Sequence, residues 1–257
     1  MRILLSNDDG ILAPGLAALH AAAADLGEVT VVAPASPQSA AGQAITVLHP
    51  LTVQRVHVKG PVEFSGLSVD GSPADCVRLA IRKLLPGPAD LVISGINAGA
   101  NVGMHVFYSG TVAAAAEGAM CGIPAVAFSA AFTSGEFDFP RIGALCRWVL
   151  DRLLADGLAP GELLNVNIPA LEPGVPKGVR VVPQSTAALV ENYHRRVDPQ
   201  GCETYTLREY EFVSAGEAND VDCLLEGYIT VTPLHVDRTD HGQLKARAGS
   251  LWGDPPV

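Results

Sequence analysis

The first 27 residues, MRILLSNDDGILAPGLAALHAAAADLG (1–27), contain the pattern that decides the fold. A continuous apolar run, residues 3–5, ends in the polar cluster SNDDG (6–10), and a helical stretch, residues 15–26, comes next. Pro14 stands near the start of that stretch and Gly27 at its end, an asymmetry typical of helices. The segment therefore predicts a buried strand, a polar loop and a helix.

The same alternation of strand and helix continues along the chain. Further apolar runs bounded by turn residues occur at 29–32, 91–93, 125–128 and 164–168. Further helical stretches occur at 73–85, 111–121 and 140–155. Apolar runs without alternation suit strands that are covered on both faces of a sheet. Strands that alternate with helices predict an α/β fold, a Rossmann-like, doubly wound and mostly parallel sheet.

Two regions do not show this alternation of strands and helices. Residues 44–58 are rich in β-branched side chains with Pro50 among them, which predicts a hairpin or an extended arm. After the Pro- and Gly-rich stretch 167–178, residues 179–239 contain β-like pieces that we expect to form an antiparallel extension without helices.

We accordingly divide the chain into a catalytic core (1–170), a β-rich C-terminal extension (171–245) and a tail (246–257). Uncovered strand edges pair readily with other chains. The extension therefore predicts a homo-oligomer, at least a dimer, built through this region.

Composition narrows the class of protein. The 257 residues carry 27 acidic and 17 basic side chains, a net charge of −10, which argues against a nucleic acid polymer as partner. No apolar run reaches the ~18 residues that span a bilayer, and no signal peptide is evident, so we expect no membrane partner. Five cysteines without CxxC spacing predict free thiols in a reducing compartment, and we expect a cytoplasmic protein.

Polar loops follow three of the expected strands. In open α/β sheets, ligands bind beyond the carboxyl ends of the strands. The loops bring Asp8 and Asp9, then Ser39 in APASPQSAAG (33–42), then Asn97 in SGINAGANVG (94–103). Oxygen donors of these types suit Mg²⁺ or Mn²⁺ better than Zn²⁺. The alternative interpretation of the aspartate pair is a helix cap or a turn.

The stretch YSGTVAAAAEG (108–118) predicts an anion site. Ser109 is a suitable N-cap, and the free backbone N–H groups of Gly110 and Thr111 at the positive helix end can bind phosphate. The hydroxyls of Ser109 and Thr111 can donate as well. The alternative is an ordinary capped helix. His105, just before this stretch, could reach a substrate, although a lone histidine more often has a core or solvated role.

Taken together, the motifs resemble those of the SurE family (survival protein E, the 5'/3'-nucleotidases). The matching stretches, in order, are ILLSNDDGILAPG, VVAPASPQSAAG, DGSPADCV, LVISGINAGANVG, YSGTVAAAAEGAMCGIPAVAFS, LLNVNIP and GYITVTPLHVDRT. The resemblance implies a Rossmann-like domain with a protruding C-terminal hairpin or tail. It also implies subunits that pair, often by exchanging that element, into homodimers or homotetramers.

The resemblance further implies an activity and a site. The activity is that of a 5'-nucleotidase, a metal-dependent phosphomonoesterase acting on nucleoside 5'- and 3'-monophosphates and in some members on short polyphosphate. One divalent ion per subunit, Mg²⁺ or Mn²⁺, is implied. By motif position, its ligands are Asp8, Asp9, Ser39 and Asn97. The implied phosphate contacts are Ser109, Gly110 and Thr111, with Asn97 close by.

Three positions depart from the family pattern. Ala35 stands where the family usually has an acidic residue, Ala40 where it usually has glycine, and Ser72 where threonine is usual. Ala35 and Ala40 flank the Ser39 loop. We therefore expect them to affect the shape of this loop and its contacts with the substrate. All four implied ligands are present, and we expect activity to be retained.

Adjacent aspartates also indicate how phosphorus would be attacked. We expect Asp8, Asp9 and Asn97 to be catalytic, with attack by a metal-activated water that Asp9 orients or deprotonates. Three alternatives stay open: an Asp-nucleophile phosphatase of the haloacid-dehalogenase type, a receiver domain, and a Mg²⁺-dependent nucleotide sensor without turnover. The first needs a second Asp two residues on, where this chain has Gly10; the second is about half this length.

Overall fold

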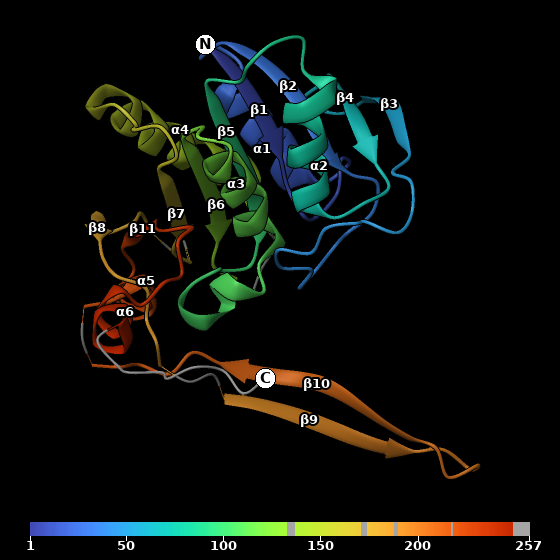
Figure 1. The fold of residues 1–257 in the computed structure, drawn as a ribbon, viewed down its shortest axis with the longest axis vertical. Helices are drawn as coiled ribbons and strands as arrows, with labels where there is room; N and C mark the ends of the chain where they lie inside the picture. The colour runs from blue at the N-terminus through green and yellow to red at the C-terminus, as the bar shows by residue number, and fades with distance from the viewer. Residues whose placement is uncertain (133–136, 171–173, 188–189, 217, 249–257) are drawn as a thin grey trace, which may run out of the picture.

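A computed structural model describes residues 1–132, 137–170, 174–187, 190–216 and 218–248. Its main feature is a nine-stranded sheet in the order β3-β4-β2-β1-β5-β6-β7-β11-β8, with helices on both faces (Figure 1). A separate two-stranded hairpin projects away from this body. The predicted mostly parallel, doubly wound α/β fold with a β-rich C-terminal addition is confirmed.

Six neighbouring strands of the sheet run parallel to one another. They are β4 (Phe64–Val69), β2 (Glu28–Pro34), β1 (Arg2–Ser6), β5 (Leu91–Ala98), β6 (Ala125–Ala130) and β7 (Leu163–Ile168). Every residue of β6 and β7 is buried, which explains why these strands are mostly apolar in sequence; the polar residues among them, Ser129, Asn165 and Asn167, are buried as well.

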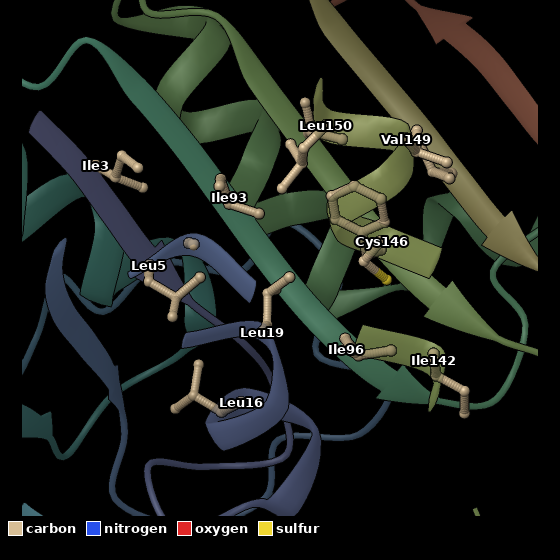
Figure 2. Close-up of a cluster of buried hydrophobic side chains, with 14 of the residues drawn as sticks. Ile3, Leu5, Leu16, Leu19, Ile93, Ile96, Ile142, Cys146, Val149 and Leu150 are labelled. Carbon is tan, nitrogen blue, oxygen red and sulfur yellow. The ribbon is translucent and has the colours of Figure 1, made fainter. Parts of the chain in front are cut away.

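Helices cover the two faces of the sheet. On one face lie α1 (Pro14–Ala23) and α4 (Phe139–Asp156); on the other lie α2 (Pro73–Leu79), which continues into the π-helix η1 (Ala80–Leu84), and α3 (Gly110–Met120). Ile3 and Leu5 of β1 point into the first layer, together with Leu19 of α1 and Leu150 of α4 (Figure 2). Leu4 points into the second layer, because successive strand side chains alternate between faces.

The point at which the strand order reverses lies between β1 and β5. From β1 the chain first adds strands on one side (β2, then β4) and then returns to add β5, β6 and β7 on the other. The loops that leave the carboxyl ends of β1 and β5 therefore diverge and leave a crevice. Open α/β sheets bind their ligands at this point, so the fold selects the end of β1 as the place for a site.

The prediction for residues 44–58 is only partly right. Strand β3 (Val53–Val58) is antiparallel, but its partner is β4, which sequence reasoning did not identify, and not residues 44–52. Those earlier residues are held by the start of α2 instead: Thr46 donates from its backbone and its hydroxyl to Asp75, and Ser72 donates to the carbonyl of Ala44. Their backbone groups thus bond to a helix cap and not to a strand.

The expectation of a helix-free antiparallel extension over residues 179–239 is wrong in two respects. Strands β8 (Val179–Val181) and β11 (Ile229–Leu234) join the main sheet, where β11 lies beside β7. A short helix, α5 (Asp220–Leu225), precedes β11. Among the strands that the structure describes in this region, β9 (Val190–Val197) and β10 (Glu203–Glu211) alone form a separate antiparallel hairpin. The β-like segments of the sequence do form strands, but the local sequence pattern does not show which sheet a strand joins.

The chain ends, within the described part, with helix α6 (His241–Ala248). Residues 249–257, most of the predicted tail, lie outside the described residues. The division of the chain into a core, an extension and a tail stays a prediction. Among the helices that the structure describes, none combines the length and the apolar character needed to cross a membrane.

Candidate metal and phosphate site

The residues predicted for the site meet at the crevice between β1 and β5. Asp8 and Asp9 follow β1, Asn97 is the next-to-last residue of β5, and Ser39 lies in the loop after β2. Together with Ser109, they line one cavity of about 540 Å³. The structure thus brings all four predicted metal ligands and one predicted phosphate contact to the same cavity.

Backbone hydrogen bonds fix the loops of this cavity against one another. The register between β1 and β5 pairs Ser6, the last residue of β1, with Ser94, and β5 continues from there to Ala98, past the end of β1. The amide of Gln38 donates to the carbonyl of Asp8 at 2.8 Å, which holds the Ser39 loop next to the aspartates. Three loops from distant parts of the sequence are therefore positioned by main-chain contacts.

The two carboxylates differ in their surroundings. Asp8 is 6% exposed and accepts a hydrogen bond of 2.5 Å from the hydroxyl of Thr111. Burial raises the pKa of Asp8 to about 6; the Thr111 hydroxyl opposes this shift and the charge of Asp9 adds to it. Burial also raises the pKa of Asp9, whose carboxylate accepts a long bond (3.4 Å) from the amide of Ala98. A cation against both carboxylates would offset the cost of burying their charges.

The donor atoms at this position fit a hard divalent cation. Asp8 and Asp9 supply carboxylate oxygens and Ser39 a hydroxyl. The side-chain nitrogen of Asn97 donates to the carbonyl of Gly99 at 2.7 Å, so Oδ1 is the amide atom that can face a cation. An all-oxygen set of this kind suits Mg²⁺ or Mn²⁺.

Carboxylates dominate the charged side chains of the cavity. Its described lining contains three carboxylates, since Glu191 joins Asp8 and Asp9, and it contains no lysine or arginine. An anion entering such a cavity meets a negative field. A bound cation would reverse that field locally and so would favour the binding of an anion.

Helix α3 begins against Asp8. As predicted, Ser109 is its N-cap, and the Ser109 hydroxyl oxygen accepts from the amide of Val112 at 3.1 Å. A Cβ on Gly110 would lie 2.7 Å from the Cβ of Asp8, so only glycine allows the helix to start this close. The N-terminal amides and the positive end of the helix are thereby brought to the carboxylates.

The structure revises the expected part played by Thr111. Its hydroxyl, predicted to donate to phosphate, donates to Asp8 instead, and its side chain is fully buried. Gly110 and Thr111 lie behind Asp8, whereas Ser109 is the member of the trio that lines the cavity. The sequence identified the helix start but could not show which way the Thr111 hydroxyl points.

A buried amide network supports the glycine loop and was missed by sequence reasoning. Asn101, which lines the cavity, bonds through its backbone to the side chains of Asn165 and Asn167 and through its own amide to Ser129. The signal was available: Asn165 and Asn167 alternate with apolar residues in β7, and buried polar side chains need partners.

Other contributors come from far along the chain. Asp220, fully buried, accepts from the amides of Gly103 and Ser185, which fixes the far end of the glycine loop.

Three hairpin residues, Glu191, Tyr193 and Leu207, also line the cavity. His105 lines it too, and its ring lies 5.0 Å from that of Phe212. No local motif marks these hairpin residues as part of a site.

The chain is similar in sequence and in fold to known proteins of one family. The sequence model of the family described as "Survival protein SurE" matches residues 3–191. A protein of Thermus thermophilus named "5'-nucleotidase SurE 1" is 46% identical over 100% of both chains. One of Syntrophobacter fumaroxidans named "5'-nucleotidase SurE" is 44% identical over 94% of this chain and 96% of its own. The crystal structure of the SurE protein from Aquifex aeolicus superimposes with a TM-score of 0.79 at 38% identity, covering 96% of this chain and 98% of that one.

One residue of the cavity lining has an unusual backbone conformation. Ala40, directly after Ser39, has φ +56° and is the one non-glycine residue with positive φ in the described ranges. Left-handed backbone costs an L-residue about 1–2 kcal/mol, a cost that glycine avoids. The neighbouring Ala41 does not share this conformation, so the two alanines form a matched pair.

We expect the two alanine-to-glycine variants to differ in stability. Ala41→Gly should lower the free energy of unfolding by about 0.4–1 kcal/mol, because glycine gives the unfolded chain more conformational freedom. Ala40→Gly should be more stable than Ala41→Gly by about 1–2 kcal/mol, because it also removes the left-handed strain. Urea denaturation followed by circular dichroism measures both. Equal losses in the two variants would show that Ala40 carries no strain.

Proposed function

The chain belongs to the SurE family, and from this premise we propose that it hydrolyses nucleoside 5'-monophosphates to nucleoside and phosphate with the help of one divalent metal ion, Mg²⁺ or Mn²⁺. The observation that carries the proposal is a cavity in which a carboxylate pair, two neutral oxygen donors and a helix N-terminus meet. The names of the relatives, 5'-nucleotidases, support the same activity. The proposal extends to 3'-monophosphates and short polyphosphate as further substrates.

The metal ion would be held by Asp8, Asp9, Ser39 and Asn97. When bound, such an ion neutralises phosphoryl oxygens and lowers the pKa of a nearby water. The protein's part is to fix its ligands. Thr111 holds one oxygen of Asp8, and Gly99 holds the amide of Asn97, so two of the four side chains are oriented by hydrogen bonds. Such preorganised contacts reduce the rearrangement needed during the reaction.

The phosphoryl group would sit between these ligands and the start of α3. The Ser109 oxygen already accepts from Val112, which leaves its proton for a phosphoryl oxygen. The amides of Gly110 and Thr111, at the positive end of the helix, add to the attraction. The Thr111 hydroxyl is committed to Asp8 and acts on phosphate only through that residue.

We propose that water, and not an aspartate, attacks phosphorus. Asp8 is buried and bonded to Thr111, which leaves it poorly placed as a nucleophile. Asp9 lines the cavity with only a long bond from Ala98, so it is the carboxylate that can orient the water and accept its proton. Asn97, beside it, completes the set of proposed catalytic residues.

A direct attack by water has a stereochemical consequence. One in-line displacement inverts the configuration at phosphorus, whereas a covalent aspartyl-phosphate route passes through two displacements and retains it. Hydrolysis of a chiral, oxygen-isotope-labelled thiophosphate ester should give inverted product by NMR. Net retention, or a trapped aspartyl-phosphate on Asp8 or Asp9, would favour the alternative of an Asp-nucleophile phosphatase.

Removal of the cation or of a carboxylate should stop the reaction. EDTA should abolish release of phosphate from AMP, and added Mg²⁺ or Mn²⁺ should restore it. Asp9→Asn should lower kcat/KM on the order of a hundredfold or more, above the ~10–100-fold typical of groups that only support a ligand. Asp156→Asn, at the exposed end of α4, is the matched control and should keep full activity.

Two outcomes would contradict the proposal. Full turnover of AMP in EDTA would exclude the metal-dependent reaction. Binding of AMP and metal without any turnover would favour the remaining alternative, a nucleotide sensor that uses the same residues without hydrolysis.

Assembly is a second part of the proposal. The hairpin exposes apolar side chains along both strands, among them Val190, Val197 and Tyr205. A two-stranded sheet has two outer edges, and such edges can pair with other chains. We propose a homodimer or homotetramer built through the region 171–245, and the exposed residues of β9 and β10 support this.

Light scattering at micromolar concentration tests the assembly. The intact chain should have at least twice the mass of one subunit. Val197→Glu should shift the protein towards monomer, because a charge would then be buried at the contact. The control Val47→Glu, which changes a side chain that is 81% exposed outside this region, should not. A stable monomer of the intact chain would contradict the proposal.

The cellular compartment is also proposed, as cytoplasm. All five cysteines are free thiols, and Cys76, Cys146 and Cys223 are buried. Free thiols persist in reducing compartments, which supports this assignment.

A further inference from the structure

The cavity is larger than a phosphoryl group requires. At the ~30 Å³ that a water molecule occupies in the liquid, its volume of about 540 Å³ corresponds to roughly eighteen waters. A phosphoryl group with its oxygens fills only a small part of this space. The remaining walls must therefore contact the rest of the substrate.

Those remaining walls include one face of the hairpin. Glu191 and Tyr193 are two residues apart in β9 and so point to the same side, and Leu207 of β10 is paired directly with Tyr193. All three line the cavity. Tyr108, just before the start of α3, supplies a second aromatic side chain to the same lining.

The base of the hairpin is attached to the loop that carries the site. Phe212, which follows β10, packs against the cluster of Val102, Val221 and Leu224, and its ring contacts that of His105. Asp220, in the next helix, bonds to the amide of Gly103. These contacts fix the hairpin base relative to residues 102–105, which directly follow Asn101, so its side chains have a defined place beside the site.

The aromatic side chains in this wall are available for a ligand. Tyr193 is 55% exposed and Tyr108 is 58% exposed, although both line a cavity. As far as the structure describes it, the lining lacks a lysine or arginine that would hold a second anionic group. A flat, uncharged aromatic group attached to the phosphate is the substrate part that such a wall accommodates.

We propose that the hairpin base forms the nucleoside subsite, with Tyr193 stacking on the nucleobase and Tyr108 and Leu207 bordering it. This inference rests on the proposed function and deepens it, because it assigns to the hairpin a role in choosing the substrate. Stacking on an aromatic ring tolerates every base, since each base has a π-face. The subsite therefore favours nucleoside monophosphates over small phosphate esters without strong selection among bases.

The hairpin provides a matched control for Tyr193. Tyr205 is the same residue type, lies on the same face of the hairpin, and is similarly exposed at 59%. It is paired with Arg195, two residue pairs along the hairpin from Tyr193, and lies outside the cavity lining. A role of the hairpin in assembly alone would not distinguish Tyr193 from Tyr205.

The test compares two substrates, AMP and glycerol 2-phosphate, with metal-loaded, full-length protein. In Tyr193→Ala, the ratio of kcat/KM for AMP to that for glycerol 2-phosphate should fall about tenfold or more, mostly through KM, as expected for loss of a base–aromatic contact. Tyr193→Phe should keep the ratio, because it keeps the ring. Tyr205→Ala should also keep it. Light scattering checks that the variants share one oligomeric state.

Binding provides a readout that does not need turnover. Calorimetry with Mn²⁺ present should show that Tyr193→Ala weakens AMP binding about tenfold or more and changes the binding of inorganic phosphate far less. If the unsubstituted protein binds AMP but hydrolyses neither substrate, the proposed function fails, and the binding comparison still decides the subsite.

Three results would overturn the inference. One is an equal loss on AMP and glycerol 2-phosphate in Tyr193→Ala, which would indicate a structural role. Another is no loss on either substrate in that variant, or a fall in the ratio of the same size in Tyr205→Ala. The last is an unsubstituted protein that binds AMP no more tightly than inorganic phosphate.

Discussion

Two adjacent carboxylates at the end of β1 are the constraint on which the rest of the site depends. Asp8 is almost fully buried, and Asp9 lines the same cavity. The described lining of this cavity also contains Glu191 but no lysine or arginine. Burial of like charges side by side is unfavourable without a compensating charge. A bound cation would resolve this conflict, and it would also make the cavity, whose own charged side chains repel phosphate, attractive to an anion.

Several features of the fold position the two aspartates and their neighbours. The reversal of strand order between β1 and β5 opens the crevice, and the loop after β2 is bonded to the backbone of Asp8. Gly110 lets the positive end of α3 approach, and Thr111 behind it fixes one Asp8 oxygen. Sheet topology, helix position and side-chain hydrogen bonds thus converge on a few oxygen atoms.

Much of this arrangement follows from sequence. The five buried strands and four helices are continuous apolar or periodic segments, and polar residues directly after strands belong at one edge of the sheet, so Asp8, Asp9, Ser39 and Asn97 could be grouped before the structure was known. Contacts that depend on orientation or on distant segments could not. The Thr111 hydroxyl could point either way, and the sheet membership of β8 and β11 depends on long-range packing. Tyr193 reaches the cavity from a strand roughly a hundred residues beyond Asn97, a pairing that no local pattern encodes.

The most direct measurement of the central claim is the affinity for inorganic phosphate with and without a divalent cation, by calorimetry on metal-free protein. If the carboxylates make the cavity repel anions until a cation binds, phosphate should bind measurably when Mn²⁺ is present and not detectably in its absence. Asp8→Asn should weaken the binding of Mn²⁺ and, with it, the binding of phosphate. Phosphate binding of equal strength in metal-free and Mn²⁺-loaded protein would contradict the account.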